Sequence, residues 1–244
     1  MARRPDPDTR NRLLAAARTA FAEVGVEAAR IEDIARAAGV SKGSFYLHFP
    51  SKEAAFAELV ASFFAVMTEL AADRHEATQE LRARIGNPTP EDWRGATPCL
   101  RAWGELDHAH TVKALKTMWR HRDVLRCVLE HASGERAHLV DRFIALTRDN
   151  LTAQLRDAMA ACGLRNDLDQ DIVSELIIGM YLQLGRRMVR ATTRPDFDAW
   201  ARTVDALTIE GLAPRSPTPS AFVAPARRPS LSTDADPLVS QVAK

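Results

Sequence analysis

Two short helical patterns joined by a single glycine, in residues 30–52, constrain the fold more than any other part of the sequence. The first pattern has apolar residues at three- and four-residue spacing, namely Ile31, Ile34, Ala35 and Ala38. This spacing puts them on one side of a helix. Gly39 comes directly after, and glycine readily adopts the left-handed conformation that ends a helix. The sequence therefore predicts a short helix that stops at Gly39.

The second pattern predicts a helix of about two turns with a polar outer surface. Ser41 can cap its first turn, and Pro50 disfavours helical geometry at Phe49. Phe45 and Phe49 are four residues apart, so both face the first helix. The residues left on the outer surface are Lys42, Gly43, Ser44, Tyr46, Leu47 and His48. A helix, a glycine turn and a polar second helix form the helix-turn-helix unit, whose second helix enters the major groove of DNA.

This segment resembles a known family. GVSKGSFYLHFPSKEAAF (residues 39–56) is similar to the DNA-reading segment of the tetracycline-repressor (TetR) family, and the similarity extends back through LLAAARTAFAEVG (residues 13–25). It rests on the aromatic pair, the glycine turn and the Ser-Lys-Glu after Pro50, and it covers roughly residues 10–60. The resemblance implies an all-α fold with an N-terminal three-helix DNA-binding domain and a larger helical effector-binding and dimerisation domain.

The remaining apolar patterns also predict helices. A first helix, capped by the Thr9 hydroxyl and ended by Gly25, has the buried stripe Leu13, Leu14, Ala17, Phe21 and Val24. A longer helix capped by Ser51 has the stripe Phe56, Leu59, Val60, Phe63, Val66, Met67 and Leu70. Further helices are expected near 97–107, 110–131, 134–162 and 168–191, and Pro195 is expected to open the last one.

Composition shifts divide the chain into four parts. We expect a flexible basic arm at 1–9, the helix-turn-helix domain at 10–54, the effector-binding and dimerisation domain at 55–213, and a disordered tail at 214–244. Pro, Ser and Ala dominate that tail.

The resemblance and the outer-face positions assign the same residues to DNA contact. Tyr46, His48 and Lys52 can each donate a hydrogen bond to a phosphate oxygen. The candidates for base edges are Lys42, Gly43, Ser44 and Leu47. Many relatives have a Thr or Ser at the position of Arg30, where it caps the helix and contacts a phosphate. Arginine departs from this family pattern because it cannot cap the helix, but it remains a candidate for the phosphate contact.

Surplus apolar surface at the end of the helical region predicts a homodimer. The pattern at 168–191 is apolar nearly all round, and Phe197, Trp200, Val204 and Leu207 follow in register over about 195–211. The resemblance implies the same pairing. A two-fold dimer presents two reading helices about one turn of DNA apart, so the operator should be a pseudo-palindrome of double-stranded DNA.

The resemblance further implies a pocket for a small apolar effector of unknown identity. Its candidate lining residues are the large side chains Phe64, Met67, Trp103, Trp119, Phe143 and Tyr181. The function that follows is a ligand-responsive transcriptional repressor, released from its operator by that effector, without a cofactor and without enzyme activity.

Two alternatives remain open. Glu105 with His108 and Glu135 with His138 match the Glu-x-x-His spacing of di-metal helical bundles, which are enzymes. The second alternative keeps the DNA-reading helix and discards the sensor, which leaves a DNA binder that responds to no ligand.

Charge and cysteine content exclude other classes. The 33 basic residues balance 32 acidic ones, so the whole chain is not a bulk polyanion binder. Cys99, Cys127 and Cys162 have no paired spacing and read as reduced thiols. The N-terminus lacks a signal-peptide pattern, and no apolar run has the length of a membrane span, so we expect a soluble cytoplasmic protein with no membrane partner.

Overall fold

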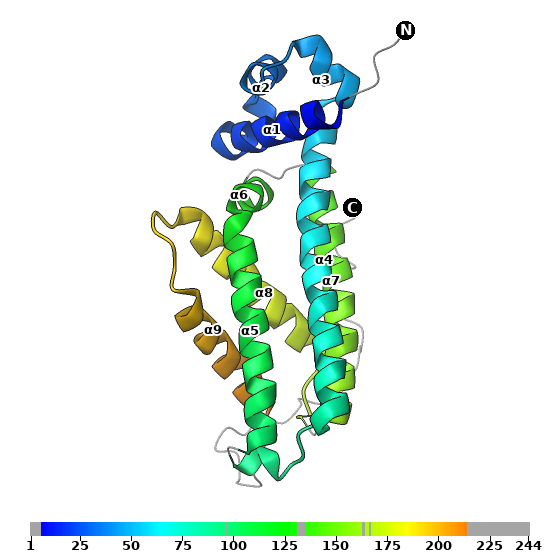
Figure 1. Cartoon of the computed structure of the whole chain (residues 1–244), viewed down its shortest axis with the longest axis vertical. Helices are drawn as coiled ribbons and strands as arrows, with labels where there is room; N and C mark the ends of the chain where they lie inside the picture. The colour runs from blue at the N-terminus through cyan, green and yellow to red at the C-terminus, as the bar shows by residue number, and fades with distance from the viewer. Residues whose placement is uncertain (1–5, 96, 131–134, 163, 166, 214–244) are drawn as a thin grey trace, which may run out of the picture. The chain divides into compact units, whose positions relative to one another are not determined.

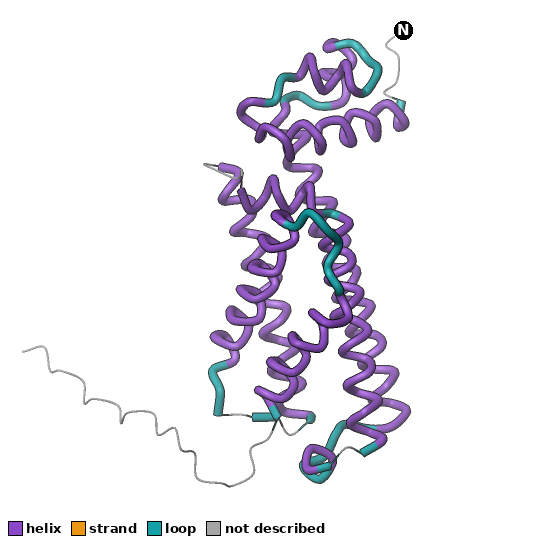
Figure 2. Tube along the Cα trace, turned by 90° about the vertical axis from the view of Figure 1, so that its left-hand side faces the viewer, coloured by secondary structure: helices purple, strands orange, loops and turns teal. Residues whose placement is uncertain are grey.

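All regular secondary structure in the described residues is helical (Figure 2). The computed structural model describes residues 6–95, 97–130, 135–162, 164–165 and 167–213, apart from several side chains of the helix at 135–161. The helices are α1 (Pro7–Ala28), α2 (Ile31–Ala37), α3 (Lys42–His48), α4 (Lys52–Ile85), α5 (Pro98–Arg120), α6 (Arg122–Glu130), α7 (Glu135–Ala161), α8 (Gln170–Arg190) and α9 (Phe197–Asp205), with a 3-10 turn η1 (Asp92–Arg94) and a π-helical turn η2 (Ala206–Glu210) (Figure 1). The all-α fold class is confirmed.

The boundaries of α2, α3 and α4 follow the capping signals in the sequence. Gly39 has a φ of 70°, the left-handed conformation in which a side chain would be strained. The Ser41 hydroxyl accepts a hydrogen bond from the Ser44 N–H at 3.2 Å. The Ser51 hydroxyl accepts one from the Ala54 N–H at 3.1 Å. These local interactions hold α3 between two fixed corners.

The start of α1 differs from the expectation. The helix begins at Pro7 and is capped by Asp6, whose carboxylate accepts the N–H of Asp8 at 3.2 Å and the hydroxyl of Thr9 at 2.9 Å. Proline suits the first position of a helix because its missing N–H has no partner there. The expected arm at 1–9 was therefore wrong for its last residues, and residues 1–5 lie outside the described part.

The end of α1 also corrects the predicted stripe. Gly25 has a φ of 78°, which kinks the helix instead of ending it. After the kink Val26 is buried, while Val24 is 55% exposed. Val24 is therefore not part of the buried stripe, and Val26 after the kink is buried instead.

The predicted break between 107 and 110 was wrong. α5 runs unbroken from Pro98 to Arg120, and the interruption comes at His121, directly before α6. His108 and Thr111, which lie at the expected break, bond a side chain of α9. The predicted break reflected an interhelical polar contact, which local sequence cannot distinguish from a helix terminus.

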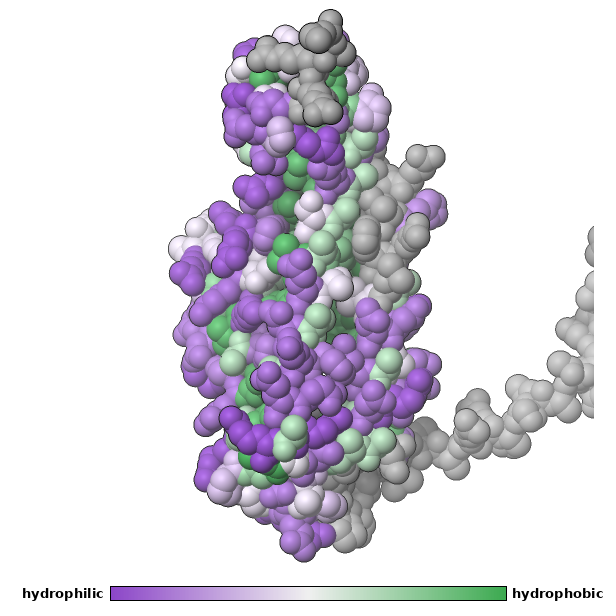
Figure 3. All heavy atoms as spheres, turned by 45° about the vertical axis from the view of Figure 1, so that its right-hand side comes forward, coloured by the Kyte–Doolittle hydropathy of each residue, from purple (hydrophilic) through white to green (hydrophobic). Residues whose placement is uncertain are grey.

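One hydrophobic core links the N-terminal helices to the rest. α1 packs against α2, α4 and α6, while α5 packs against α4 and α9, and α8 against α6 and α7. The core runs from Phe21 and Phe45 through Phe56 to Leu115. On the face shown in Figure 3, hydrophilic residues cover most of the described surface, and hydrophobic ones show as narrow strips.

α4 carries the apolar stripe expected of it. Phe56, Val60, Phe63 and Leu70 are buried. Within the described residues α4 is also the one helix that is long and apolar enough to cross a membrane by length and composition alone. Its buried stripe is what a core helix of a folded domain requires.

Candidate DNA interface and effector cavity

The outer face of α3 is formed by residues one and four positions apart. Lys42, Gly43, Tyr46 and Leu47 are exposed there, Tyr46 at 49% and Leu47 at 65%. Ser44 and His48 are half-buried at the edges of this face. The helix thus presents one cation, a phenol and an apolar side chain side by side.

The inner face of α3 is fixed by two phenylalanines. Phe45 is fully buried and Phe49 is 2% exposed. Their ring centroids lie 5.6 Å apart, and the ring of Tyr46 meets that of Phe45 edge-on at 5.8 Å. Because the inner face is locked, the outer side chains project from a rigid base.

Arg10 is a bracing residue that the sequence patterns did not reveal. Its guanidinium lies 4.5 Å from the ring centroid of Phe49 and donates a hydrogen bond to the His48 carbonyl at 2.9 Å. It also forms an ion pair with Glu58 of α4. α1, α3 and α4 are therefore joined at one side chain, and no local pattern links positions so far apart.

Lys42 is paired with Glu32 of α2 at 2.6 Å. The hydrogen bond from the ammonium lowers the pKa of Glu32 and raises that of Lys42. Both side chains remain half exposed to water. Lys42 therefore has to exchange this partner before it can contact a base.

Of the expected phosphate contacts, Lys52 is bound to other groups, whereas Arg30 is exposed. The Lys52 ammonium donates to the carbonyls of Glu27 at 2.5 Å and Ala29 at 3.3 Å, at the end of α1. Arg30 is exposed at the N-cap of α2 and makes no side-chain cap, as expected for arginine. Lys52 therefore fixes the end of α1 beside α4.

A cavity of about 490 Å³ lies among α4, α5, α7, α8 and η2. Its apolar wall includes Trp93, Trp103, Leu155 and Ile177. Trp103 and Tyr181, two of the expected effector contacts, belong to the lining. Burial raises the pKa of the Tyr181 phenol.

The other expected effector contacts lie elsewhere. Phe64 and Met67 pack against the hydrophobic core. Trp119 meets the ring of Phe197 at 6.1 Å and stacks under Arg122. Phe143 belongs to α7, but its side chain lies outside the described residues. Large side chains in a helical bundle more often fill the core than line a cavity.

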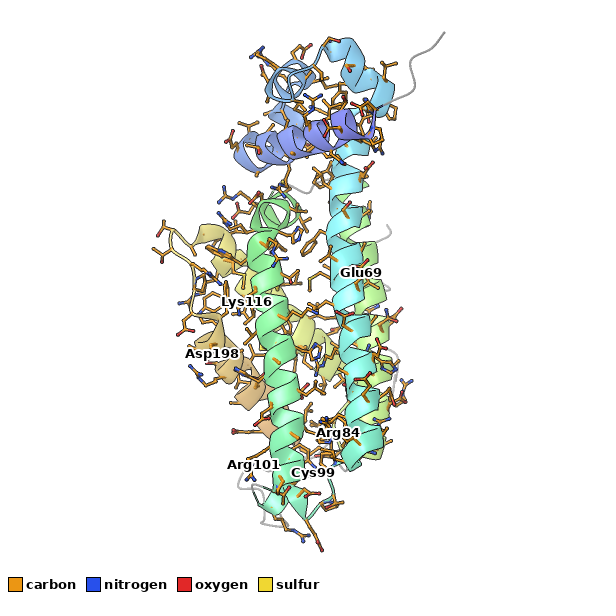
Figure 4. All side chains as sticks on the ribbon, viewed as in Figure 1. Glu69, Arg84, Cys99, Arg101, Lys116 and Asp198 are labelled. Atoms are coloured by element: carbon orange, nitrogen blue, oxygen red, sulfur yellow. The ribbon has the colours of Figure 1, made fainter. Side chains whose placement is uncertain are left out.

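A polar network joins α5 to α9 beside this cavity. His108 Nδ1 lies 2.7 Å from the Asp205 carboxylate, and Nε2 lies 2.9 Å from that of Asp198. Asp198 is labelled on α9 in Figure 4. Thr111 donates to Asp205 at 2.8 Å. The hydrogen bonds to Asp198 and Asp205 raise the pKa of His108, so the imidazolium is the form that this network stabilises.

This network predicts a pH dependence of stability. The folded-state pKa of His108 exceeds its unfolded value, so its contribution is fully present below about pH 6.5 and is lost as the pH rises through the folded pKa. We expect the Tm of His108→Gln to lie below that of the wild type at pH 6, and the two to converge by pH 9. Thermal unfolding of both proteins across this range measures the difference. A difference in Tm that is the same at pH 6 and pH 9 would refute the role of the His108 charge.

The di-metal alternative gains no supporting observation. In the described part of the chain, no three His, Cys, Asp or Glu side chains are grouped to hold a metal ion. Both ring nitrogens of His108 face carboxylates of α9, and His138 is exposed. The Glu135 side chain lies outside the described residues.

Comparison with known proteins agrees with the geometry of α1 to α4. Residues 13–59 match the family model for bacterial regulatory proteins of the tetR family. An uncharacterised HTH-type transcriptional regulator of Bacillus subtilis, YdgC, is 43% identical over 63 residues, which are 26% of this chain and 32% of that protein. The HTH-type transcriptional repressor KstR2 of Rhodococcus jostii is 39% identical over 80 residues, 31% of this chain and 39% of that one. The match thus spans a third to two fifths of these relatives.

Solved structures share the fold over most of the chain. A TetR-like regulator from Rhodococcus sp. RHA1 has a TM-score of 0.61 at 19% identity. The match covers 87% of this chain and 100% of that chain. FadR of Bacillus subtilis, solved in complex with stearoyl-CoA, has a TM-score of 0.58 at 17% identity, covering 82% of this chain and 98% of that one. At such identities the likeness shows the fold alone.

These observations define a helix-turn-helix protein with a helical C-terminal region. Residues 13–59 are similar to the tetR family of bacterial regulatory proteins, and this similarity covers the helix-turn-helix segment.

Proposed function

We propose that the protein is a ligand-responsive transcriptional repressor that binds a pseudo-palindromic DNA operator as a homodimer. The observation that carries this proposal is the exposed outer face of α3, fixed from beneath by Phe45 and Phe49 within the family's DNA-binding segment. A helix with a locked apolar face and an exposed polar one is suited to reading a major groove.

Specific roles follow from the positions of the side chains. Lys42 and Leu47, with Gly43 and Ser44, are proposed to meet base edges. The phosphate contacts are proposed for Tyr46, His48, Lys52 and Arg30. The exposure of Tyr46 and Leu47 supports these roles.

A second copy is proposed to cover the last two helical segments, α8 and α9 with η2. Ile172 is 53% exposed, Leu176 68% and Leu207 67%, which leaves large apolar side chains in water. Gly179 lies near the middle of α8, and a Cβ there would meet nothing within 4 Å. A glycine in an exposed helix interior is costly, and close approach of a partner helix would account for it.

The cavity is the proposed effector site, within a proposed C-terminal domain at 55–213. Its volume is in the range of about 300–1,000 Å³ that is usual for ligand sites. The stearoyl-CoA complex of FadR shows that one protein of this fold binds a ligand with a long apolar chain. The same proposal places the protein in the cytoplasm and gives it no enzyme activity.

Binding to DNA from the protein's own locus tests the function. We expect a footprint with two protected half-sites whose centres are about 34–36 Å apart. Affinity should fall steeply with salt because phosphate contacts release counterions. A monomer that binds no double-stranded fragment of that region would refute the proposal. Release of the DNA on addition of a ligand would distinguish a ligand-responsive repressor from a constitutive DNA binder.

Lys42→Ala tests the base-reading role of α3. We expect about a tenfold loss of affinity for the operator and a smaller loss on unrelated DNA, because a base contact discriminates sequence. Glu32→Gln is the matched variant: it frees Lys42 from its partner and should not weaken operator binding. Fluorescence anisotropy on both DNAs measures the effect. Equal losses on the two DNAs would contradict the assignment.

A further inference from the structure

The lining of the cavity carries an excess of negative charge. Its acidic residues are Asp107, Asp157, Asp205 and Glu210, against two arginines, Arg74 and Arg82, and one histidine, His75. A half-enclosed site with this imbalance attracts cations and opposes anions. The charge of the lining therefore favours cationic ligands.

Both arginines already have partners. Arg74 forms an ion pair with Asp107. Arg82 donates to the side-chain oxygens of Asn87 at 2.9 Å and Gln79 at 3.5 Å. A ligand carboxylate would have to displace these contacts. The cavity therefore offers an anion little that is ready to bind it.

Two of the carboxylates remain available. Asp205 already accepts from Thr111 and faces His108. Within the part of the chain that the structure describes, the side chains of Asp157 and Glu210 make no hydrogen bond or ion pair, and both residues are exposed. They are free to accept hydrogen bonds from a charged donor.

The two tryptophans of the lining have their indole N–H groups bound to backbone carbonyls. The Trp93 indole N–H donates to the Cys162 carbonyl at 2.9 Å, and that of Trp103 to the Gly86 carbonyl at 3.1 Å. Their only polar atoms are thus used by the backbone. What remains for a ligand is aromatic surface, which binds flat apolar groups and attracts cations.

We infer that the cavity takes an organic cation with a flat apolar body, placed against Trp103 and Trp93 with its ammonium group toward Asp157 and Glu210. This inference rests on the proposed effector site and names the chemical class of its ligand. Its charge distinguishes it from an apolar ligand with an anionic head.

A matched series of three naphthalene compounds tests the charge preference. Isothermal titration of the full chain with 1-naphthylmethylammonium, 1-naphthylmethanol and 1-naphthoate compares a cation, a neutral alcohol and an anion on one ring system. We expect the ammonium compound to bind about tenfold more tightly than the alcohol, and the naphthoate to bind weakest.

Variants locate the preference. Asp157→Asn with Glu210→Gln should remove most of the advantage of the cation and leave binding of the alcohol unchanged. Trp103→Leu should weaken all three compounds. Glu69→Gln, an exposed carboxylate of α4 outside the lining (Figure 4), is the matched control and should change none of them.

The outcomes separate this inference from the proposed function. Binding of none of the compounds, a preference for the naphthoate, or a cation preference that survives Asp157→Asn with Glu210→Gln would overturn the inference. In each case operator binding by the same preparation would leave the DNA-binding function standing. Cation binding that leaves DNA affinity unchanged would support the inference and count against a ligand-responsive repressor.

Discussion

Phe45→Ala should destabilise the protein by about 3–5 kcal/mol and abolish operator binding, because it opens a cavity beneath the DNA-reading helix. Phe45 is fully buried and meets the rings of Tyr46 and Phe49. Without it, the inner face of α3 loses one of its two buried aromatic anchors, and Lys42 and Leu47 lose their common orientation. Chemical denaturation and DNA titration measure the two effects.

Val24→Ala is the control for this prediction. Val24 also belongs to the N-terminal helices, but it is 55% exposed, so its truncation should change stability by less than about 0.5 kcal/mol. A loss below about 1 kcal/mol for Phe45→Ala, with operator affinity retained, would show that α3 does not depend on its buried aromatic face.

Leu176→Asp should convert the proposed dimer to a monomer and weaken operator binding at least about a hundredfold. Leu176 is 68% exposed on α8. In a two-fold dimer both subunits contribute this residue to the interface, so one substitution changes the interface at two places. Burying a leucine contributes roughly 1.5–3 kcal/mol, and a carboxylate there would add an unpaired charge to the interface. Sedimentation velocity and DNA titration test both effects.

Ile85→Asp provides the matched change at another exposed apolar residue. Ile85 is 40% exposed at the end of α4, away from α8 in the sequence, and its replacement should leave the oligomeric state unchanged. If Leu176→Asp remained a dimer with normal operator affinity, the proposed interface on α8 would be wrong.

The local signals of the sequence were sufficient for the DNA-reading part. Gly39, Ser41 and Ser51 act on the backbone within a few residues, so their effects can be read directly from neighbouring positions. The buried pair Phe45 and Phe49 follows from helical spacing for the same reason. Lys42 was placed on the correct helix, but its pairing with Glu32 of α2 was not foreseen.

The C-terminal region was less predictable because its contacts join distant segments. Of the six large side chains expected at the effector site, Trp103 and Tyr181 line the cavity, while Phe64, Met67 and Trp119 pack elsewhere. Composition cannot distinguish a core residue from a cavity residue, since both are apolar and both lie on inward faces.

The sequence by itself determined the helical class, the corners around α3 and which side chains of α3 face outward, because these depend on interactions within one or two helical turns. Only the tertiary structure decided that α5 continues past His108, that Arg10 braces α3 against α4, and that carboxylates and two tryptophans line the cavity. Each of these depends on residues brought together from helices far apart in the chain. Such contacts leave no periodic trace in the sequence.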